Sequence, residues 1–447
     1  MKKKILFIFL FLFLIVVAFI HSFYLTNLYS YDEIWNYGFA KNILDGLVPY
    51  KDFNMVVPPL FSYVTSIILW LFGEKLMVYH IFIAVLVVGI TYLAFRKIGW
   101  HSLLIYVALL IYAMNGYNVF SLLLLFVLFS ILDKKLKYQD LIVPFLISLM
   151  IFSKQTLIVL ILPSLIYSKN KKKTMMVYFT CFLAFLVYLL ICNSFYQFVD
   201  YCLLGMFEFG EKNALSEPIY FILEILICFW LVYQLVRSRF QRQDIFYCLM
   251  FQIIVLPIID ISHFMLTFSS LVYVFFQDNN WGKFFNNSFF AVVLTILLSV
   301  LFLHDYNTTI SQRIYLGHSS NDTFLKGRLI PNVTDNYIQD MNKIIHTYPG
   351  YKLYILGNYS YVIKLALDIP INKYDLINHG NMGYRGSERY IQEIDEDCQE
   401  QQCLFIVHDD ELRSKAYNQT SMQILEYVTN NYYKIYATSI FGVYITQ

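Results

Sequence analysis

Residues 31–73 read YDEIWNYGFAKNILDGLVPYKDFNMVVPPLFSYVTSIILWLFG, and this stretch follows an apolar run at residues 5–22. Asp32 and Glu33 therefore form an adjacent pair of carboxylates just beyond a run that is long enough to cross a membrane. Carboxylates so close to hydrocarbon are costly to keep unless a partner or a function uses them. The segment at residues 23–75 is therefore predicted to be an active-site loop at a membrane face.

The composition indicates an α-helical polytopic membrane protein, because 58% of the residues are hydrophobic and only 14% are charged. The mean hydropathy is +0.56. The net charge of +2 gives no reason to expect nucleic acid, since the basic residues occur as short clusters between apolar runs. Among the seven cysteines, only Cys398 and Cys403 share a polar region. They could form a disulfide, but a spacing of five residues matches no recognised framework, so the sequence does not favour one.

Apolar runs separated by basic clusters continue through the first two thirds of the chain. The runs expected to span the membrane are residues 5–22, 76–95, 102–115, 117–132, 141–153, 155–168, 175–194, 218–237, 245–258, 264–276 and 288–303. Placing the basic clusters in the cytoplasm gives about eleven spans, a cytoplasmic N-terminus and an extracytoplasmic C-terminus. The first run lacks a small-x-small cleavage site and is expected to be an uncleaved helix.

The run at residues 59–73 is treated differently. It is short, it begins at Pro58-Pro59, and counting it as a span would place neighbouring basic residues outside. We expect it to be a juxtamembrane or re-entrant helix on the outer side. The break at Lys154-Gln155 between two later runs is expected to be a turn at the same outer face.

The chain changes character at about residue 304, where charged residues become frequent. Runs at residues 353–356 and 404–407 are typical of buried strands, and helical patterns lie between them. We therefore expect two domains, a transmembrane domain at residues 1–303 and an extracytoplasmic α/β domain at residues 304–447. The second is long enough to hold a core of its own.

The pair Asp32-Glu33 has two interpretations. A carboxylate at the boundary between water and lipid can accept a proton from a hydroxyl nucleophile, while its neighbour binds a structural partner. Alternatively, both acids cap the helix that starts near Ile34 and satisfy its free N–H groups. Position alone favours neither interpretation.

Several further elements follow in a fixed order. These are Gly46 at the end of a helix, Pro49-Tyr50-Lys51-Asp52, and Pro58-Pro59-Leu60. Together with the acid pair, they resemble the first external loop of GT-C glycosyltransferases, in the protein O-mannosyltransferase and aminoarabinose transferase-like branch (glycosyltransferase family 39-like). The resemblance implies a GT-C-like fold and transfer of a sugar from a polyprenyl-phosphate carrier to an acceptor at the outer face. It also implies that Asp32 is the catalytic general base, with Glu33 orienting it or the acceptor.

Such a reaction needs a base on one side of the anomeric carbon and cations or N–H donors on the other, beside the departing phosphate. Attack from the face opposite the phosphate predicts inversion. The candidate donors are Lys51, Lys154 with its neighbour Gln155, and His263. Each has a simpler interpretation: Lys51 is a solvated loop charge, Lys154 extends from a helix end to water, and His263 is a satisfied turn histidine.

Tyr50 and Trp35 could stack on a sugar, although aromatic side chains at such positions are more often interfacial anchors. His80 stands where members of the resembled family often have an arginine. A neutral imidazole is a weaker partner for a phosphate dianion, so this substitution weakens one expected contact. Asp200, Glu208 and Glu211 lack the spacing of a dedicated metal site. We therefore expect no cofactor, while a divalent metal is unsupported rather than excluded.

The expected partners are a polyprenyl-phosphate-linked sugar donor, a lipid, glycan or protein acceptor, and membrane lipids, with no nucleic acid. Two other functions compete with transfer. A transporter or flippase of lipid-linked sugars would place ionisable groups at mid-membrane within related halves, and no repeat is visible. A non-catalytic envelope-assembly protein would use the acids only as helix caps.

Overall fold

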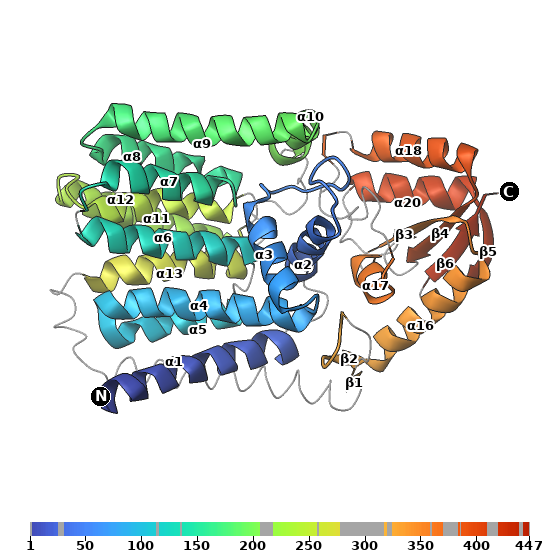
Figure 1. Cartoon of the computed structure of the whole chain (residues 1–447), viewed down its shortest axis with the longest axis horizontal. Coiled ribbons are helices and arrows are strands. Elements are labelled where there is room, and N and C mark those ends of the chain that lie inside the picture. The colour runs from blue at the N-terminus through green and yellow to red at the C-terminus, as the bar shows by residue number, and fades with distance from the viewer. Residues whose placement is uncertain are drawn as a thin grey trace.

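The computed structural model divides into a helical bundle and a smaller unit that contains a β-sheet (Figure 1). Helices α2 (Tyr31–Leu44) and α3 (Leu60–Phe72) lie between them. The structure describes residues 2–25, 31–112, 116–134, 136–205, 218–256, 259–277, 317–319, 324–357, 360–369, 383–384, 386–408, 419–437 and 441–446. The expected domain boundary at residue 303 lies outside these ranges.

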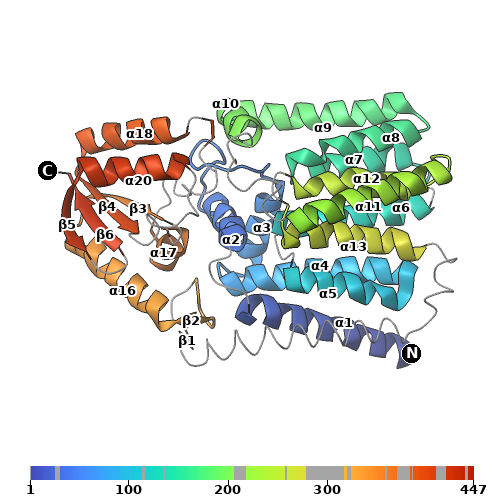
Figure 2. The same cartoon turned by 180° about the vertical axis from the view of Figure 1, so that it is seen from behind.

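The bundle helices run roughly parallel to the long axis of the molecule (Figures 1 and 2). They are α1 (Lys2–Ile20), α4 (Leu76–Ile98), α5 (Ser102–Tyr112), α6 (Gly116–Lys134), α7 (Gln139–Ile151), α8 (Ile161–Tyr167), α9 (Lys171–Ile191), α11 (Pro218–Arg237), α12 (Gln243–Phe251) and α13 (Ile261–Gln277). Short helical turns extend or join some of them: η1 (His21–Leu25), η2 (Gly99–His101), η3 (Gln155–Leu160), α10 (Phe195–Phe198), η4 (Val199–Leu204) and η6 (Gln252–Val255).

Within the described part of the chain, four helical segments are long and apolar enough to cross a membrane: Leu76–Leu110, Gly116–Lys134, Lys171–Ile191 and Pro218–Arg237. Shorter apolar helices cover most of the other expected spans. The expected run at residues 288–303 lies outside the described residues. The exact number of spans therefore stays a prediction.

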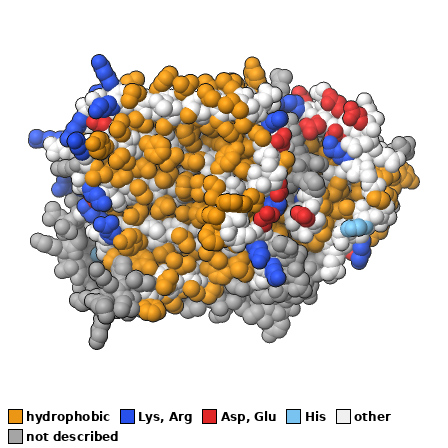
Figure 3. Space-filling model, in the orientation of Figure 1, with side chains coloured by type: hydrophobic (Ala, Val, Ile, Leu, Met, Phe, Trp, Pro, Cys, Tyr) orange, Lys and Arg blue, Asp and Glu red, His pale blue; other side chains and the backbone are white. Residues whose placement is uncertain are grey.

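The face of the bundle seen in Figure 3 is largely apolar, as a lipid-facing surface must be. Ile191 is 79% exposed and Phe229 is 69% exposed. Lysine and arginine side chains gather at the end of the bundle farthest from the sheet-containing unit (Figure 3). This arrangement of an apolar belt with a basic end is typical of an integral membrane protein.

Helix α3 has one buried face and one exposed apolar face. Phe61 and Leu69 are buried, whereas Trp70 and Phe72 are highly exposed. The helix begins directly after Pro58-Pro59 and ends at Gly73, whose φ of 105° is unfavourable for residues with a side chain. Its place beside α2, at the junction of bundle and sheet-containing unit, fits the expected juxtamembrane helix (Figure 1).

The C-terminal unit contains a four-stranded sheet in the order β3 (Lys352–Leu356), β4 (Cys403–His408), β6 (Phe441–Ile445) and β5 (Tyr433–Ala437). β3 and β4 are parallel, and the other two pairs are antiparallel. Helices α16 (Asn332–Thr347), α17 (Ser360–Ala366), α18 (Gly386–Glu400) and α20 (Gln419–Asn431) surround it, and β1 (Gly317–Ser319) pairs with β2 (Leu329–Pro331). The two runs expected as strands form β3 and β4.

A disulfide joins Cys398, near the end of α18, to Cys403 at the start of β4, with Cα atoms 5.5 Å apart. The sequence did not favour this bond, and that expectation is wrong. The spacing matched no framework, but the reversal of the chain between helix and strand brings the two residues together. Disulfides persist in oxidising compartments, which bears on the location of this unit.

Candidate active site

Helix α2 carries the acid pair and lies at the junction between the bundle and the C-terminal unit (Figures 1 and 2). The side chain of Asp32 lies outside the described residues, so the role expected for Asp32 stays a prediction. The side chain of Glu33 is described and is buried, with 6% of it exposed. The acid pair thus lies at one end of the bundle, as the loop interpretation requires.

Glu33 is the centre of a buried ionic cluster with His80 of α4 and Arg328. Arg328 Nη1 donates to Glu33 Oε1 at 2.7 Å, and His80 Nε2 lies 2.7 Å from the same oxygen. Arg328 is fully buried and His80 is 3% exposed. The ring of Phe23 packs against both, with centroid distances of 5.5 Å to His80 and 5.7 Å to the Arg328 guanidinium.

The electrostatics of this cluster keep Glu33 ionised. Burial acts to raise the pKa of Glu33, but the adjacent Arg328 guanidinium and His80 outweigh it and lower that pKa below its ordinary value. A carboxylate that already accepts two such contacts is a poor proton acceptor for a substrate. These contacts fit the interpretation in which Glu33 binds structural partners, and its role in the reaction stays a prediction.

Sequence reasoning missed Arg328. The residue is separated from Glu33 by 295 positions and follows a short turn, in which the Arg328 N–H donates to the Leu325 carbonyl at 2.9 Å. The segment Lys326-Gly327-Arg328 carries no recognised motif. From the sequence, the arginine that His80 replaces was expected as a phosphate contact, and no cation was predicted beside Glu33. In the structure, Arg328 Nη1 lies 3.2 Å from His80 Nε2.

Tyr50 and Gln155 form a second cluster, which fixes the loop between α2 and α3. The Tyr50 hydroxyl donates to the Val57 carbonyl at 2.8 Å, and Gln155 Nε2 donates to the carbonyls of Val56 (2.8 Å) and Cys202 (3.0 Å). Tyr50 has no exposed surface and a φ of 69°, and burial raises its pKa well above the ordinary value. This burial argues against an interfacial anchor.

Trp35 and Lys154 are also buried. Trp35, on α2, is 7% exposed, which again does not fit an interfacial anchor. Lys154 is 5% exposed, and its ammonium donates to Asn118 Oδ1 at 3.1 Å and to the Ile254 carbonyl. The Tyr117 ring lies 5.7 Å from the Lys154 ammonium. Lys154 therefore points into the protein, so the interpretation that it extends to water does not fit the structure.

The two remaining candidate cations lie apart from Glu33. Lys51 is exposed in the loop after α2. His263, in the first turn of α13, lies with Nδ1 2.9 Å from Asp260 Oδ1, and the same oxygen accepts the His263 backbone N–H. Among the described residues, neither Lys51 nor His263 forms a hydrogen bond or ion pair with the Glu33 cluster. The geometry of His263 is that of a satisfied turn histidine.

No group of three or more histidine, cysteine or acidic side chains that could hold a metal ion occurs among the described residues. Glu208 and Glu211 lie outside them. Asp200 instead connects η4 to the C-terminal unit, because its Oδ1 accepts the Tyr384 N–H at 3.0 Å and its Oδ2 pairs with Arg389. Among the described residues, ionic contacts at Asp200 and at Glu33 thus tie the C-terminal unit to the bundle.

The two units also meet where α2 packs against α17. A Cβ atom on Gly38 would overlap the ring of Tyr361, so only glycine permits this approach. The Phe39 ring also packs edge-on against Tyr361, with centroids 6.4 Å apart. Helix α17 therefore lies directly against the helix that carries the acid pair.

We expect Gly38→Ala to destabilise the protein by about 1–3 kcal/mol, because the added methyl group forces the Tyr361 ring to move. Combining it with Tyr361→Ala should remove the overlap, so the double variant should be more stable than the sum of the single effects predicts. Thermal unfolding of the detergent-solubilised protein measures this. Gly89→Ala in α4 is the matched control, because its Cβ would meet only Leu123 Cδ1 at an ordinary 3.5 Å. Equal effects at Gly38 and Gly89 would contradict the proposed packing constraint.

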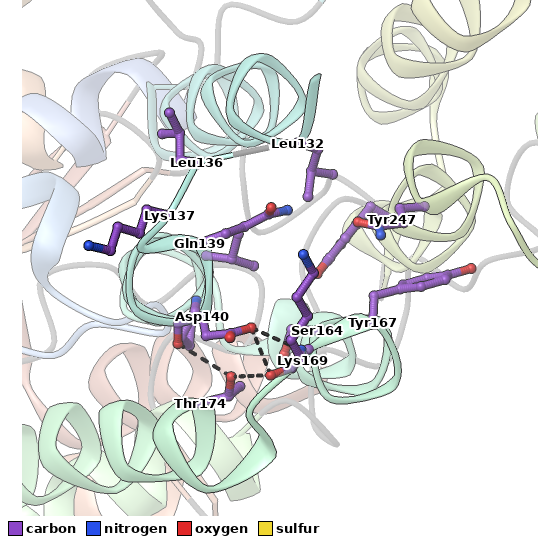
Figure 4. A pocket seen from close by; sticks show the side chains of 14 residues that line it. Leu132, Leu136, Lys137, Gln139, Asp140, Ser164, Tyr167, Lys169, Thr174 and Tyr247 are labelled. Carbon is purple, nitrogen blue, oxygen red and sulfur yellow. Dashed lines mark hydrogen bonds between the residues drawn. The ribbon is translucent and has the colours of Figure 1, made fainter. Parts of the chain in front are cut away.

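Two cavities flank these elements at opposite ends of the bundle. The larger, about 800 Å³, lies between α2, the start of α4 and α17, and we call it the α2–α17 cavity. A smaller pocket of about 170 Å³ lies at the basic end, among α7, α8 and α12 (Figure 4). There Asp140 Oδ1 accepts bonds from the Ser168 hydroxyl and the Lys169 N–H, so its carboxylate is occupied. Of these two, the larger cavity adjoins the acid-bearing helix.

No protein-family model and no curated protein matches the sequence. Among solved structures, the crystal structure of ArnT from Cupriavidus metallidurans bound to undecaprenyl phosphate has a TM-score of 0.58 and 12% identity, covering 99% of this chain and 98% of that chain. ArnT in the apo state has a TM-score of 0.53 at 12% identity, with the same coverage. The chain therefore has the fold of ArnT, an aminoarabinose transferase of the GT-C class.

Proposed function

We propose that this protein is a membrane glycosyltransferase that moves a sugar from a polyprenyl-phosphate carrier to an acceptor hydroxyl, with inversion. The observation that carries the proposal is the place of the acid pair on α2, at one end of a bundle with the GT-C fold, with Glu33 held in a buried ionic cluster. ArnT, which shares this fold, was crystallised with undecaprenyl phosphate. A lipid carrier suits the setting, because its tail lies in the bilayer and its phosphate lies at the headgroup plane.

In the proposed reaction, the acceptor oxygen attacks the anomeric carbon from the face opposite the phosphate. The new carbon–oxygen bond forms as the bond from that carbon to the phosphate oxygen breaks, and the electron pair leaves with the phosphate. The proton of the acceptor hydroxyl passes to the Asp32 carboxylate. Glu33 positions Asp32 by fixing the first turn of α2 to His80 and Arg328.

The departing phosphate needs positive charge. We assign this role to Lys51, because its side chain is exposed in the loop that follows the acid-bearing helix. Lys154 and His263 are weaker candidates, since each already has protein partners. We assign Tyr50, Trp35 and Gln155 the role of holding the loop between α2 and α3 in position.

We also propose that the C-terminal unit is extracytoplasmic and the N-terminus cytoplasmic. The basic residues gather at the opposite end of the bundle, as the positive-inside rule predicts for the cytoplasmic face (Figure 3). The disulfide in the C-terminal unit suits an oxidising compartment. The acid pair would then face the outside, where a flipped carrier-linked sugar is available.

The oxidation state of Cys398 and Cys403 tests this orientation. We expect a denatured sample from unreduced cells to take up maleimide–polyethylene glycol at the five free cysteines, and at all seven after reduction. The reason is that Cys398 and Cys403 are bonded in the native protein. The shifts are measured by gel mobility, with a Cys398→Ser/Cys403→Ser variant as control. Seven adducts without reduction would contradict an oxidised, extracytoplasmic unit.

The function itself is tested by mass spectrometry of carrier-linked sugars and envelope glycans from cells with and without the gene. We expect loss of the gene to accumulate a carrier-linked sugar and to remove one glycan modification. If the protein instead moves the carrier-linked sugar across the membrane of vesicles and passes no sugar to an acceptor, it is a transporter.

A further inference from the structure

The α2–α17 cavity adjoins the face of α2 that carries Glu33. Glu33, Tyr37 and Lys41 are spaced at i, i+4 and i+8, which places them along one side of the helix, and the last two line the cavity. Tyr37, which lines the cavity, follows Glu33 by four residues, a rise of about 6 Å along the helix axis. The turn that supplies Arg328 closes the same region, because Phe324 also lines the cavity.

A buried polar group in the cavity wall indicates a ligand. Asn42 is 1% exposed and lines the cavity, and its Nδ2 has no hydrogen-bond partner among the described residues. Buried amide groups in folded proteins nearly always have a partner. A ligand with a hydrogen-bond acceptor would satisfy this donor.

The charges of the wall indicate what kind of ligand fits. Three carboxylates (Asp45, Glu74 and Asp368) line the cavity against two lysines (Lys41 and Lys364). The Lys41 ammonium is already paired with Asp45 and, at 3.2 Å, with Glu74. Acidic side chains are visible at this junction of bundle and C-terminal unit in Figure 3. Carboxylates accept hydrogen bonds from hydroxyl groups and repel phosphate.

Two aromatic rings complete the wall. The Tyr37 and Phe324 rings lie 4.9 Å apart and both line the cavity. Aromatic side chains provide an apolar surface for the C–H face of a sugar ring, while amide and carboxylate groups bind its hydroxyls. The combination is suited to a carbohydrate and unsuited to a phosphorylated headgroup.

We propose that the α2–α17 cavity binds the acceptor substrate, and that this acceptor is an uncharged, hydroxyl-rich glycan. The inference rests on the proposed transferase function and adds to it the chemical class of the acceptor. It assigns Asn42 as a glycan-binding donor and Asp45 and Glu74 as acceptors for glycan hydroxyls. The phosphate-bearing carrier then binds elsewhere, on the Lys51 side of the loop.

The test uses the full-length protein in nanodiscs and two photo-crosslinking probes. One is a pool of diazirine-tagged uncharged oligosaccharides of hexose and N-acetylhexosamine, and the other is the same pool carrying a terminal phosphate. We expect the uncharged pool to label peptides that line the cavity, with labelling blocked by the untagged pool. Asn42→Leu should lower this labelling about fivefold to tenfold, the effect of one lost hydrogen bond. Asn342→Leu, on exposed surface of α16, should leave it unchanged.

A second variant keeps the proposal testable if Asn42→Leu fails to fold. Asp45→Asn changes an exposed carboxylate and should raise labelling by the phosphorylated pool relative to the uncharged pool. Binding of undecaprenyl phosphate, followed by native mass spectrometry, separates the two proposals. If the protein does not bind undecaprenyl phosphate, the transferase proposal fails. If it binds this lipid but the cavity is unlabelled, equally labelled in Asn42→Leu, or preferentially labelled by the phosphorylated pool, the glycan-acceptor proposal alone is overturned.

Discussion

Asp32→Asn is expected to lower sugar transfer by about a thousandfold, because general-base catalysis contributes about 10²–10⁴ in rate. Asparagine preserves the size of the side chain but cannot take the proton of the attacking hydroxyl. The effect should fall on kcat, while the apparent affinity for the carrier changes little. Transfer from a polyprenyl-phosphate-linked sugar by the purified protein in nanodiscs provides the measurement.

The matched control is Asp133→Asn on α6, which removes a carboxylate that lies 2.9 Å from the Lys97 ammonium and is not on the acid-bearing helix. It should retain transfer within a factor of about two, because exposed ion pairs contribute little to stability. Both variants should insert into membranes in equal amounts. Full activity of Asp32→Asn would show that the acids serve only as helix caps or partners, and the non-catalytic interpretation would then be favoured.

The sequence was sufficient for those features that depend on local patterning. The apolar runs predicted the bundle, and the runs at residues 353–356 and 404–407 predicted β3 and β4. The double proline before Leu60 marked the start of α3. These features follow from hydrophobic periodicity and backbone preference, which act over a few residues.

The partners of the candidate site could not be predicted in the same way. Arg328 reaches Glu33 only because the C-terminal unit packs on α2, and no local pattern reports a contact between residues that are 295 positions apart. For the same reason, the sequence could not show that Tyr50 and Gln155 are joined through the backbone near Val56 and Val57. The α2–α17 cavity likewise depends on segments that are distant in the sequence.

The second large effect concerns the buried pair of Glu33 and Arg328. Replacing either partner alone, by Glu33→Gln or Arg328→Met, should destabilise the protein by about 3–5 kcal/mol, because an unpaired charge or hydrogen-bonding group stays buried. The double variant should be more stable than the sum of these losses predicts, since both charges are removed together. Thermal unfolding in detergent measures all three.

Activity measurements on these variants show whether Glu33 positions α2 for catalysis or only stabilises the fold. If Glu33 holds the first turn of α2 in place, the double variant should regain stability but keep a lowered kcat, with the apparent affinity for the carrier little changed. Lys343→Gln, a surface charge in α16 that is 75% exposed, is the control and should change neither property. A double variant with full kcat would mean that the cluster only stabilises the fold.

The pH dependence of stability gives an independent test of the same pair. Because the folded protein lowers the pKa of Glu33, the pair contributes stability above the ordinary glutamate pKa, and this contribution is lost as the pH falls toward the lower pKa of the folded state. Acidification should therefore destabilise the wild-type protein more than Glu33→Gln, which has no group to protonate at this position. If acid destabilises both proteins equally, Glu33 is not held ionised by Arg328 and His80, and the first turn of α2 must be fixed by other contacts.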